Sequence, residues 1–256
     1  MTPAVFDLTG RVALVTGSSR GIGAALAEGL AAAGARVVLN GRDAAALEGA
    51  RAALEAAHPG QVEVAGFDVT DDAAVRAAVD GIEDRVGPID VLVNNAGVQH
   101  RVPMLDLDVA DWHRVLDANL TGPFLVARAV ARHMLPRGRG KIVNVASVQA
   151  RLARPGIAPY AASKGGLAML TRTMCAEWGP SGVQANAIAP GYFDTVLTSA
   201  LVNDPTFDAW VRGRTPAGRW GRPEELVGTV LWLASAGSDF VNGQIVHVDG
   251  GMTAVV

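Results

Sequence analysis

The sequence predicts an α/β protein built on one doubly wound, seven-stranded parallel sheet with helices on both faces. Short β-branched runs alternate with Ala- and Leu-rich segments of helical length, the order typical of parallel sheets with right-handed crossovers. The runs are almost continuously apolar, as in strands that are buried on both sides. Of the 256 residues, 50% are hydrophobic and 18% charged, which suits one large core. We therefore expect a single domain over residues 1–256.

Seven segments have the composition of strands, and five segments between the first six of them have that of helices. The strands are expected at residues 11–16, 36–40, 62–67, 89–94, 141–146, 183–189 and 244–248. The helices are expected near residues 21–33, 43–57, 71–86, 108–135 and 160–178. Gly34 and the pair Pro59–Gly60 end the first two helices, and Asp71 or Thr70 can cap the third.

One stretch, from about residue 192 to 222, departs from this alternation. It contains Pro205, Pro216 and four arginines between positions 212 and 222, and it has no clear strand. In a compact wound domain, an insertion of this length after a strand favours a cover over a binding site rather than a linker. We predict a substrate lid here.

Composition excludes several classes of protein. The net charge of −3 provides no broad basic field for nucleic acid, and the basic stretch at 132–141 is expected to be a solvated helix end and loop. The one cysteine, Cys175, can form no intramolecular disulfide and is expected to be a buried structural thiol. No signal peptide, membrane span or metal-ligand spacing is apparent, so we expect a cytoplasmic protein without a bound metal or membrane partner.

The stretch "TGSSRGIG" at residues 16–23 follows the first predicted strand and begins the first predicted helix. Gly17 allows a tight turn, Gly21 allows the backbone to approach a pyrophosphate, and Gly23 allows the helix to pack closely on the strand. The free N–H groups of the helix start then face an anion. The context of strand, glycine loop and helix predicts a dinucleotide-binding Rossmann fold rather than a plain turn.

The end of the second strand indicates which dinucleotide is bound. An acidic residue there usually binds the ribose 2′-hydroxyl of NAD, but this sequence has Asn40 and Gly41 followed by Arg42. A 2′-phosphate needs a cation, and an arginine offers a planar fork of donors. Arg20 can add a second charge, whereas Asp43 stands one position late and is expected to cap a helix. NADP(H) is therefore favoured over NAD(H).

A rare tyrosine and a rare lysine indicate the chemistry. The chain contains two tyrosines and two lysines, and Tyr160 precedes Lys164 by four residues. Residues four apart share one face of a helix, so both side chains are expected to project into one cleft. Tyr160 can protonate a developing alkoxide, and the cation of Lys164 should bring the phenol pKa down from its usual value of about 10.

Several further motifs follow predicted strand ends in a fixed order. They are "NNAG" at 94–97, Asn119 in "DANLTG", Ser147, the Tyr160–Lys164 pair, Pro190–Gly191 and "VNGQIVHVDGG" near the end. Together with the spacing of the glycine loop, this set resembles the short-chain dehydrogenase/reductase family over almost the whole chain. The resemblance implies that Ser147 holds the substrate carbonyl and that Asn119 anchors a water relay to Lys164. It also implies NADP use and a homotetramer packed through the C-terminal run and the long helices.

The resemblance and the glycine loop together give the expected sites. The catalytic residues are Asn119, Ser147, Tyr160 and Lys164. The cofactor-binding residues are Gly17, Ser19, Arg20, Gly21, Ile22, Gly23, Asn40, Arg42, Asp68, Val69, Asn95, Ala96, Gly97, Tyr160, Lys164, Pro190, Gly191, Phe193 and Thr195. By resemblance, Asp68 and Val69 lie near the adenine, and Phe193 and Thr195 lie near the nicotinamide amide.

The closer features, such as "NNAGVQHR" and "RTPAGRWGRPEELVG", resemble family members that interconvert D-gluconate and 5-dehydro-D-gluconate. A sugar acid needs a cation for its carboxylate and polar partners for its hydroxyls. Gln99, His100 and Arg151 are nearby polar residues, and either Arg101 or Arg154 is expected to bind the carboxylate. The expected substrate residues are Arg101, Ser147, Gln149, Arg154, Tyr160 and Tyr192.

Two alternatives remain open. A reductase of 3-oxoacyl thioesters, carried on acyl carrier protein or coenzyme A, shares every catalytic motif, and the four arginines at 212–222 could dock an acidic carrier. A non-catalytic NADP-binding sensor belongs to a different class, but it has no reason to keep Ser147, Tyr160 and Lys164 together.

Overall fold

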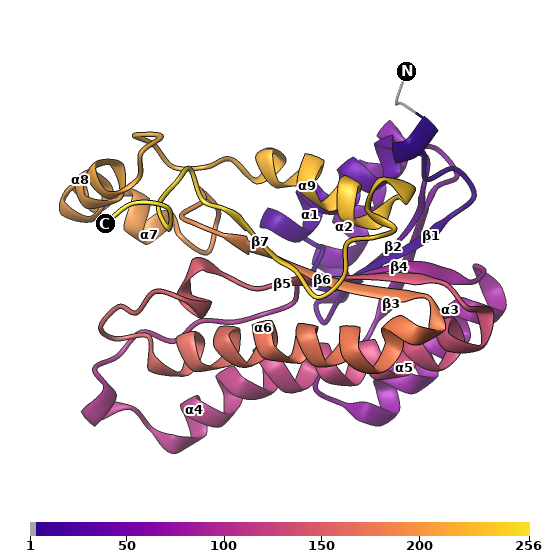
Figure 1. Cartoon of the computed structure of the whole chain (residues 1–256), viewed down its shortest axis with the longest axis horizontal. Coiled ribbons are helices and arrows are strands. Elements are labelled where there is room, and N and C mark those ends of the chain that lie inside the picture. Colours follow the sequence, from indigo (N-terminus) through magenta and orange to yellow (C-terminus); the bar gives the residue numbers. More distant parts are fainter. Residues whose placement is uncertain (1–3) are drawn as a thin grey trace.

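The structure, a computed structural model, describes residues 4–256. Seven parallel strands form one sheet in the order β3-β2-β1-β4-β5-β6-β7 (Figure 1). The doubly wound sheet predicted from the alternation of segments is confirmed. The strands are β1 (Val12–Val15), β2 (Arg36–Gly41), β3 (Val62–Gly66), β4 (Ile89–Asn94), β5 (Gly140–Val145), β6 (Val183–Pro190) and β7 (Ile245–Val248).

The helices occupy the connections between strands. They are α1 (Gly21–Ala32), α2 (Ala44–Ala57), α3 (Asp72–Arg85), α4 (Val109–Leu116), α5 (Gly122–Arg137), α6 (Ala158–Trp178), α7 (Ser199–Val202), α8 (Pro205–Arg214) and α9 (Val227–Ala234). Asp43 caps α2 through Ala46 N. Asp71, rather than Thr70, caps α3 through Ala73 N and Ala74 N.

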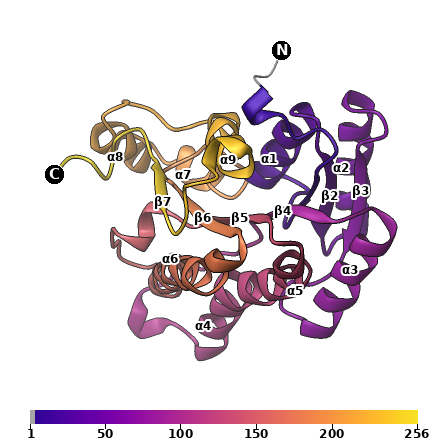
Figure 2. The same ribbon diagram turned by 45° about the vertical axis from the view of Figure 1, so that its right-hand side comes forward.

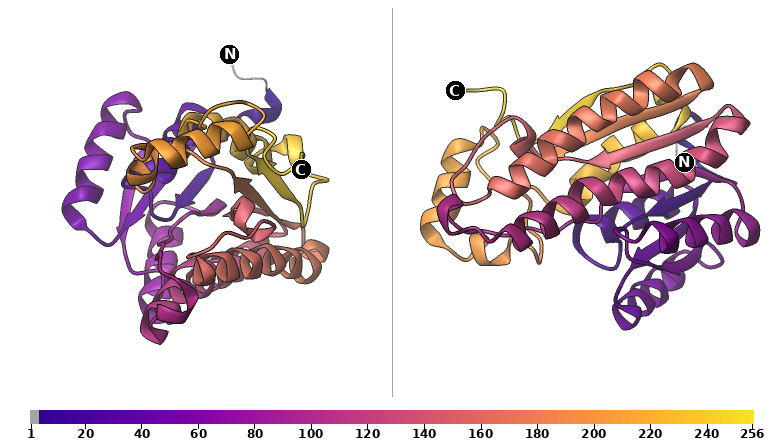
Figure 3. Two further views of the ribbon diagram at one scale, coloured as in Figure 1. Left: turned by 90° about the vertical axis from the view of Figure 1, so that its left-hand side faces the viewer. Right: turned by 90° about the horizontal axis from the view of Figure 1, so that it is seen from below.

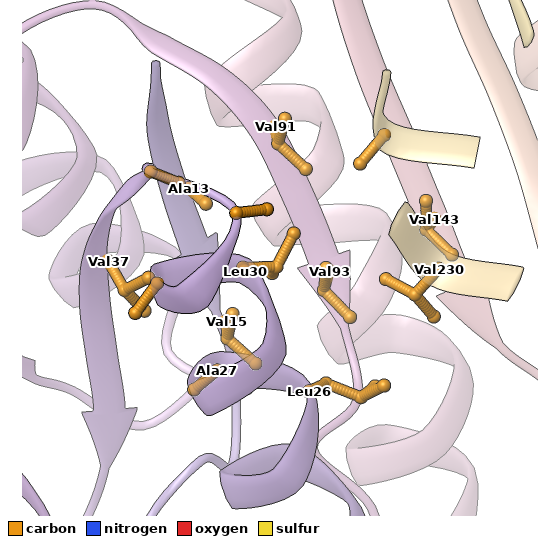
Figure 4. Packing of buried hydrophobic residues seen from close by; sticks show 14 of the residues in the cluster. Ala13, Val15, Leu26, Ala27, Leu30, Val37, Val91, Val93, Val143 and Val230 are labelled. Atoms are coloured by element: carbon orange, nitrogen blue, oxygen red, sulfur yellow. The ribbon is translucent and has the colours of Figure 1, made fainter. Parts of the chain in front are cut away.

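Two apolar cores lie on opposite faces of the sheet. On one face, α1, α2 and α9 pack on the strands through buried residues such as Leu30, Leu47 and Val230. On the other face, α3, α5 and α6 pack through residues such as Val79, Val130 and Met174. Figures 2 and 3 show these two layers of helices with the sheet between them. Figure 4 shows the first core, where Leu26 and Leu30 of α1 face the valines of the central strands.

The helix expected over 108–135 is not continuous. α4 ends at Leu116, and a π-helical turn, Asp117–Thr121, precedes α5. Within this turn Gly122 N donates to Asp117 O, five residues earlier, and Pro123 has no N–H for the carbonyl of Asn119 four residues before it. The apolar pattern predicted a helix but could not reveal this change of hydrogen-bonding period, which brings the buried side chain of Asn119 under β4 and its following loop.

Two other details differ from the expectations. Cys175 on α6 is half-buried rather than fully buried, and it packs against the left-handed turn at Gly243. A further helix, α9, fills the connection between β6 and β7 for which we predicted none. Its apolar side contributes Val230 and Leu233 to the core.

Residues 192–222 form a helical excursion after β6. It contains α7 and α8, which lie together at one end of the molecule (Figure 1). A parallel bridge between Phe193 and Gly221 closes its base, with Asp194 N donating to Gly221 O and Gly221 N donating to Tyr192 O, both at 2.9 Å. We refer to residues 192–222 as the helical excursion below.

Candidate active site

One cavity of about 1160 Å³ lies at the carboxyl ends of the strands, where ligands bind in doubly wound sheets. Loops that follow β1, β2, β3, β4, β5 and β6 all contribute to its lining. Every residue expected to bind cofactor or substrate lines this cavity, and so do Ser147, Tyr160 and Lys164. Asn119 is the one expected site residue that does not.

The glycine loop is shaped by close backbone contacts. Gly17 has φ +63°, and a Cβ there would lie 2.8 Å from Ala96 Cα in the loop after β4. A Cβ on Gly23 would lie 2.3 Å from Gly17 O, so α1 packs directly on the turn that precedes it. At Gly21, in contrast, a Cβ would meet nothing within 4 Å. The loop is therefore tight on the protein side and open on the side that faces the cavity.

The "NNAG" turn is tied to the glycine loop. The side-chain Nδ2 of Asn95 donates to Thr16 O at 3.0 Å and to Gly17 O at 2.9 Å. The Thr16 hydroxyl accepts from the backbone N–H groups of Asn95 and Ala96, both at 3.0 Å. These bonds fix the two loops on either side of the point where the order of the strands reverses.

At the end of β2, the structure separates the roles of Asn40 and Arg42. Asn40 is fully buried. Its Oδ1 accepts from Gly17 N, and its Nδ2 donates to Ala65 O and Phe67 O. Although Asn40 lines the cavity, its amide is thus occupied in holding the glycine loop. Arg42 is exposed, and its guanidinium lies 3.4 Å from Asp68 Oδ2 at the cavity wall. Sequence reasoning did not anticipate this pair.

The reacting groups lie on α6 and just after β5. Ser147 follows β5 in extended backbone, and its Oγ accepts from Gln149 N at 3.1 Å. Tyr160 lies in the first turn of α6. One turn later, Lys164 is buried and donates from Nζ to Val145 O at 2.7 Å. Its Nζ lies 5.6 Å from the centre of the Tyr160 ring. The predicted placement of both side chains on one helical face is confirmed.

The electrostatics of this pair differ from the expectation. Burial raises the pKa of Tyr160, and the Ser147 hydroxyl and the charge of Arg101 oppose that rise only in part. Burial also lowers the pKa of Lys164 to about 8. Desolvation thus outweighs the pairing that the sequence suggested. The phenol stays protonated near neutral pH, which suits a group that donates a proton.

Asn119 lies behind the reacting groups rather than in the cavity. Its Oδ1 accepts from Val98 N at 2.8 Å, and its Nδ2 donates to Val98 O at 2.8 Å and to Ser163 Oγ at 3.2 Å. Because Ser163 immediately precedes Lys164, these bonds join the loop after β4 to the catalytic segment of α6. The hydrogen bonds of the Asn119 amide are therefore made to other groups of the protein.

A second part of the cavity wall, which we call the substrate wall, carries the guanidinium groups of Arg101 and Arg154. Partial burial and the like charge of Arg154 lower the pKa of Arg101. The ion pairs within residues 4–256 involve other arginines, such as Arg114 with Asp111. No carboxylate of this part of the chain lies within ion-pairing distance of Arg101 or Arg154. Two like charges that share a cavity wall in this way favour an anionic ligand.

Gln149 and Tyr192 complete this wall. Gln149 Nε2 donates to Tyr192 Oη at 3.4 Å. Gln149 Oε1 is buried without a hydrogen-bond partner in the described chain. A buried acceptor without a donor is costly, and this one lies two residues after Ser147. Other atoms of Gln149 line the cavity, close to the place where the reacting carbonyl would lie.

Other polar residues considered from the sequence lie elsewhere. His100 packs between Asp111 and Arg114, and neither it nor Arg151 lines the cavity, whereas Gln99 does. The sequence reasoning missed cavity residues of α4 and the helical excursion; they are His113, Arg114, Val196, Leu197 and Leu201. The apolar pair Val196 and Leu197 could have pointed to this part of the site, because the structure shows both side chains exposed.

Two features are absent from residues 4–256. No helix in this range is long and apolar enough to span a membrane. No group of three His, Cys, Asp or Glu residues in the same range is arranged to hold a metal ion.

Comparisons with known proteins agree with this geometry. Residues 17–253 match a family described as enoyl-(acyl carrier protein) reductase. The chain is 54% identical over 251 residues to gluconate 5-dehydrogenase of Gluconobacter oxydans, with 98% of each chain covered. It is 48% identical over 254 residues to 5-keto-D-gluconate 5-reductase of Escherichia coli K12, with 98% of this chain and 99% of the relative covered.

The chain is also similar to a solved structure of a protein of this kind. The crystal structure of a gluconate 5-dehydrogenase from Burkholderia cenocepacia, in complex with NADP and tartrate, has a TM-score of 0.96. It is 54% identical in sequence, and the match covers 98% of both chains.

Proposed function

Because the chain belongs to the short-chain dehydrogenase/reductase family, we propose that it interconverts D-gluconate and 5-dehydro-D-gluconate as an NADP-dependent oxidoreductase. The observation that carries the proposal is that one cavity joins the glycine loop, the Ser147–Tyr160–Lys164 cluster and two arginines without carboxylate partners. The relatives whose printed names state this reaction match the chain at 54% and 48% identity.

The residues around the glycine loop fit NADP. The open space at Gly21 and the N-terminus of α1, which has no side-chain cap, suit a pyrophosphate. Arg42 and Arg20 supply the charge for the 2′-phosphate, and Asp68 and Val69 border the adenine side. The remaining residues assigned to the cofactor in this proposal are Gly17, Ser19, Ile22, Gly23, Asn40, Asn95, Ala96, Gly97, Tyr160, Lys164, Pro190, Gly191, Phe193 and Thr195.

When bound in this cavity, NADPH would supply the hydride that the ketone carbon accepts. Ser147 holds the carbonyl oxygen by a hydrogen bond, and the protonated Tyr160 phenol gives that oxygen its proton. The charge of Lys164 stabilises the phenolate that remains. Asn119 supports the relay that returns a proton to Lys164 from behind, because its bond to Ser163 holds the segment of α6 that carries Lys164. In the reverse direction, the Tyr160 phenolate removes the proton of the alcohol.

The substrate wall accounts for the substrate class. Arg101 and Arg154 bind the carboxylate at one end of the sugar acid. Gln149 and Tyr192, whose side chains are hydrogen-bonded to each other, line the cavity where hydroxyls next to the reacting carbon would lie. We assign the helical excursion as the lid over this wall, since Val196, Leu197 and Leu201 line the same cavity.

A direct assay tests the proposal. Purified protein should oxidise NADPH, followed at its absorbance maximum, when 5-dehydro-D-gluconate is added. It should reduce NADP when D-gluconate is added at alkaline pH. Failure with 5-dehydro-D-gluconate, together with reduction of another ketone, would refute the substrate assignment.

The alternative thioester reaction is tested in the same series. A 3-oxoacyl thioester should be a poor substrate, because the substrate wall carries two guanidinium groups rather than a long apolar channel. A kcat/KM for the thioester that exceeds the value for the keto acid would favour that alternative. NADPH binding without turnover of any ketone would favour a sensor.

Assembly and location are separate proposals. We infer a homotetramer, supported by the large apolar side chains exposed on α5, α6 and the segment before β7; these are Phe124 (39% exposed), Met169 (58%) and Phe240 (104%). Light scattering of the purified chain should give four times its mass of 26.4 kDa. We infer a cytoplasmic location, which cell fractionation tests.

A further inference from the structure

The guanidinium of Arg154 is held from behind by an aromatic ring of the helical excursion. Its Cζ lies 4.8 Å from the ring centre of Phe207, on α8. Arg154 lines the cavity, but Phe207 does not. A guanidinium over a ring face is attracted by the electron density of the ring, so Phe207 restrains the charged end of Arg154 at the cavity wall.

Phe207 is itself fixed by three other aromatic side chains. We call Tyr192, Phe207, Trp210 and Trp220 the aromatic cluster. Tyr192 meets Phe207, Trp210 and Trp220 edge-on, with ring centres 5.5, 5.6 and 5.7 Å apart. Trp220 is buried, and its Nε1 donates to Asp208 at 2.7 Å. Edge-to-face pairs of this kind prefer a defined geometry.

The cluster joins α8 to a segment that lines the cavity. Tyr192 reaches the cavity from the end of β6. Burial raises the pKa of its phenol, and the charge of Arg154 and a hydrogen bond to it oppose that rise. Phe207 therefore contacts both polar residues of this wall, Arg154 over its ring face and Tyr192 in a T-shaped ring pair.

No carboxylate of residues 4–256 forms an ion pair with Arg154, so its anchors are the Phe207 ring and a side-chain hydrogen bond to the Tyr192 phenol. An arginine side chain has many rotamers, and binding a ligand must remove part of that freedom. A side chain that is held in place before the substrate arrives avoids part of this cost.

We propose that Phe207 is a positioning residue that sets the selectivity for an anionic substrate by holding Arg154 toward the cavity. This inference rests on the proposed function, and it assigns to α8 a role beyond covering the site. Phe207 contacts no reacting atom and should not affect the chemistry at Tyr160.

The test compares two substrates that differ in one charge. They are 5-dehydro-D-gluconate and its C1 amide, which keeps the hydroxyls and the ketone. In Phe207→Leu, KM for the acid should rise about tenfold, with kcat and the KM for NADPH nearly unchanged. KM for the amide should change little. Phe207→Tyr keeps the ring face and should restore the wild-type KM.

The matched control is Phe124→Leu. It breaks a similar pair, in which Arg128 Cζ lies 5.0 Å from the centre of the Phe124 ring on α5, and neither of these residues lines the cavity. This variant should leave the ratio of the two KM values at the wild-type level. If Phe207→Leu does not fold, Phe207→Met serves as the aliphatic variant.

A double-mutant cycle tests whether Phe207 acts on the substrate through Arg154. In an Arg154→Gln background, Phe207→Leu should have no further effect on KM for the acid. Equal losses for acid and amide, or a full effect that persists without Arg154, would overturn the inference. Tartrate binding, measured by calorimetry with NADPH present, should weaken in Phe207→Leu but not in Phe124→Leu. Turnover of 5-dehydro-D-gluconate by the wild type tests the proposed function separately.

Discussion

Lys164 Nζ donates a 2.7 Å hydrogen bond to the carbonyl oxygen of Val145. This bond ties the buried cation of α6 to the last residue of β5, two residues before Ser147. Helix and strand are therefore joined directly beside the reacting groups.

Tyr160→Phe should remove almost all turnover. It deletes the one phenol placed to protonate the carbonyl oxygen and leaves the ring in its pocket. A general acid contributes about 10²- to 10⁴-fold to rate, and we expect a loss of kcat in that range. NADPH binding, measured by fluorescence, should persist, which separates lost chemistry from a lost fold. A kcat close to that of the wild type would rule out this role.

The rates of ketone reduction and of alcohol oxidation should depend on pH in different ways. Lys164 has a pKa lowered to about 8 by burial, so its charge is present below that pH and is lost above it. The kcat/KM for ketone reduction should fall as pH rises through about 8. The raised pKa of Tyr160 keeps the phenol protonated throughout this range. Alcohol oxidation requires the phenolate, so its rate should rise with pH.

Lys164→Arg provides the control for this profile. An arginine stays charged at all working pH values, so the variant should be slower than the wild type but should show no fall near pH 8. A fall at the same pH in the variant would assign the titration to another group.

Arg42→Ala should weaken NADPH binding by about tenfold or more, since charge-assisted hydrogen bonds are among the strongest in proteins. NADH binding should be unaffected, because NADH lacks the 2′-phosphate. Arg51→Ala on α2, where the arginine pairs only with Glu48, should change neither. Both dissociation constants can be measured by fluorescence titration.

A change at Asp68, which pairs with Arg42, should instead strengthen the binding of NADPH. Asp68→Asn removes the carboxylate 3.4 Å from the guanidinium, and the uncompensated charge of Arg42 should then attract the phosphate more strongly. The ratio of the NADH to the NADPH dissociation constant should rise. A lower ratio would mean that Asp68 contributes more to binding the adenosine half than to restraining Arg42.

Two glycine-to-alanine changes should have opposite effects on stability. At Gly23, an added Cβ would lie 2.3 Å from Gly17 O and 2.4 Å from Asn95 Nδ2. The free energy of unfolding should fall by about 1–3 kcal/mol, as for other overpacked sites. At Gly49, on the exposed side of α2, a Cβ meets nothing within 4 Å. That change should add about 0.5–1 kcal/mol.

Urea denaturation measures both effects. NADPH binding should also be lost in Gly23→Ala, because the glycine loop would have to move, and should be retained in Gly49→Ala. Equal stability of the two variants would contradict the close packing of α1 on this loop.

The agreement between sequence and structure was best where information is local. The seven strands were predicted within a residue or two of their bounds, and the five inner strands are buried on both sides, which leaves a continuous apolar run. The helix expected over 108–135 is present, but the sequence did not reveal the π-helical turn inside it, because that segment stays helical while its hydrogen bonds span five residues instead of four. The assignment of NADP from Arg42 agrees with the NADP complex of the Burkholderia relative.

The sequence by itself determined the sheet, the glycine loop and the shared face of Tyr160 and Lys164, since each depends on residues within a few positions of one another. Only the tertiary structure decided that burial raises the pKa of Tyr160, that Asn40 holds the loop, and that Phe207 supports Arg154. Burial and contacts between distant segments arise from the packing of the whole chain, and no local pattern encodes them.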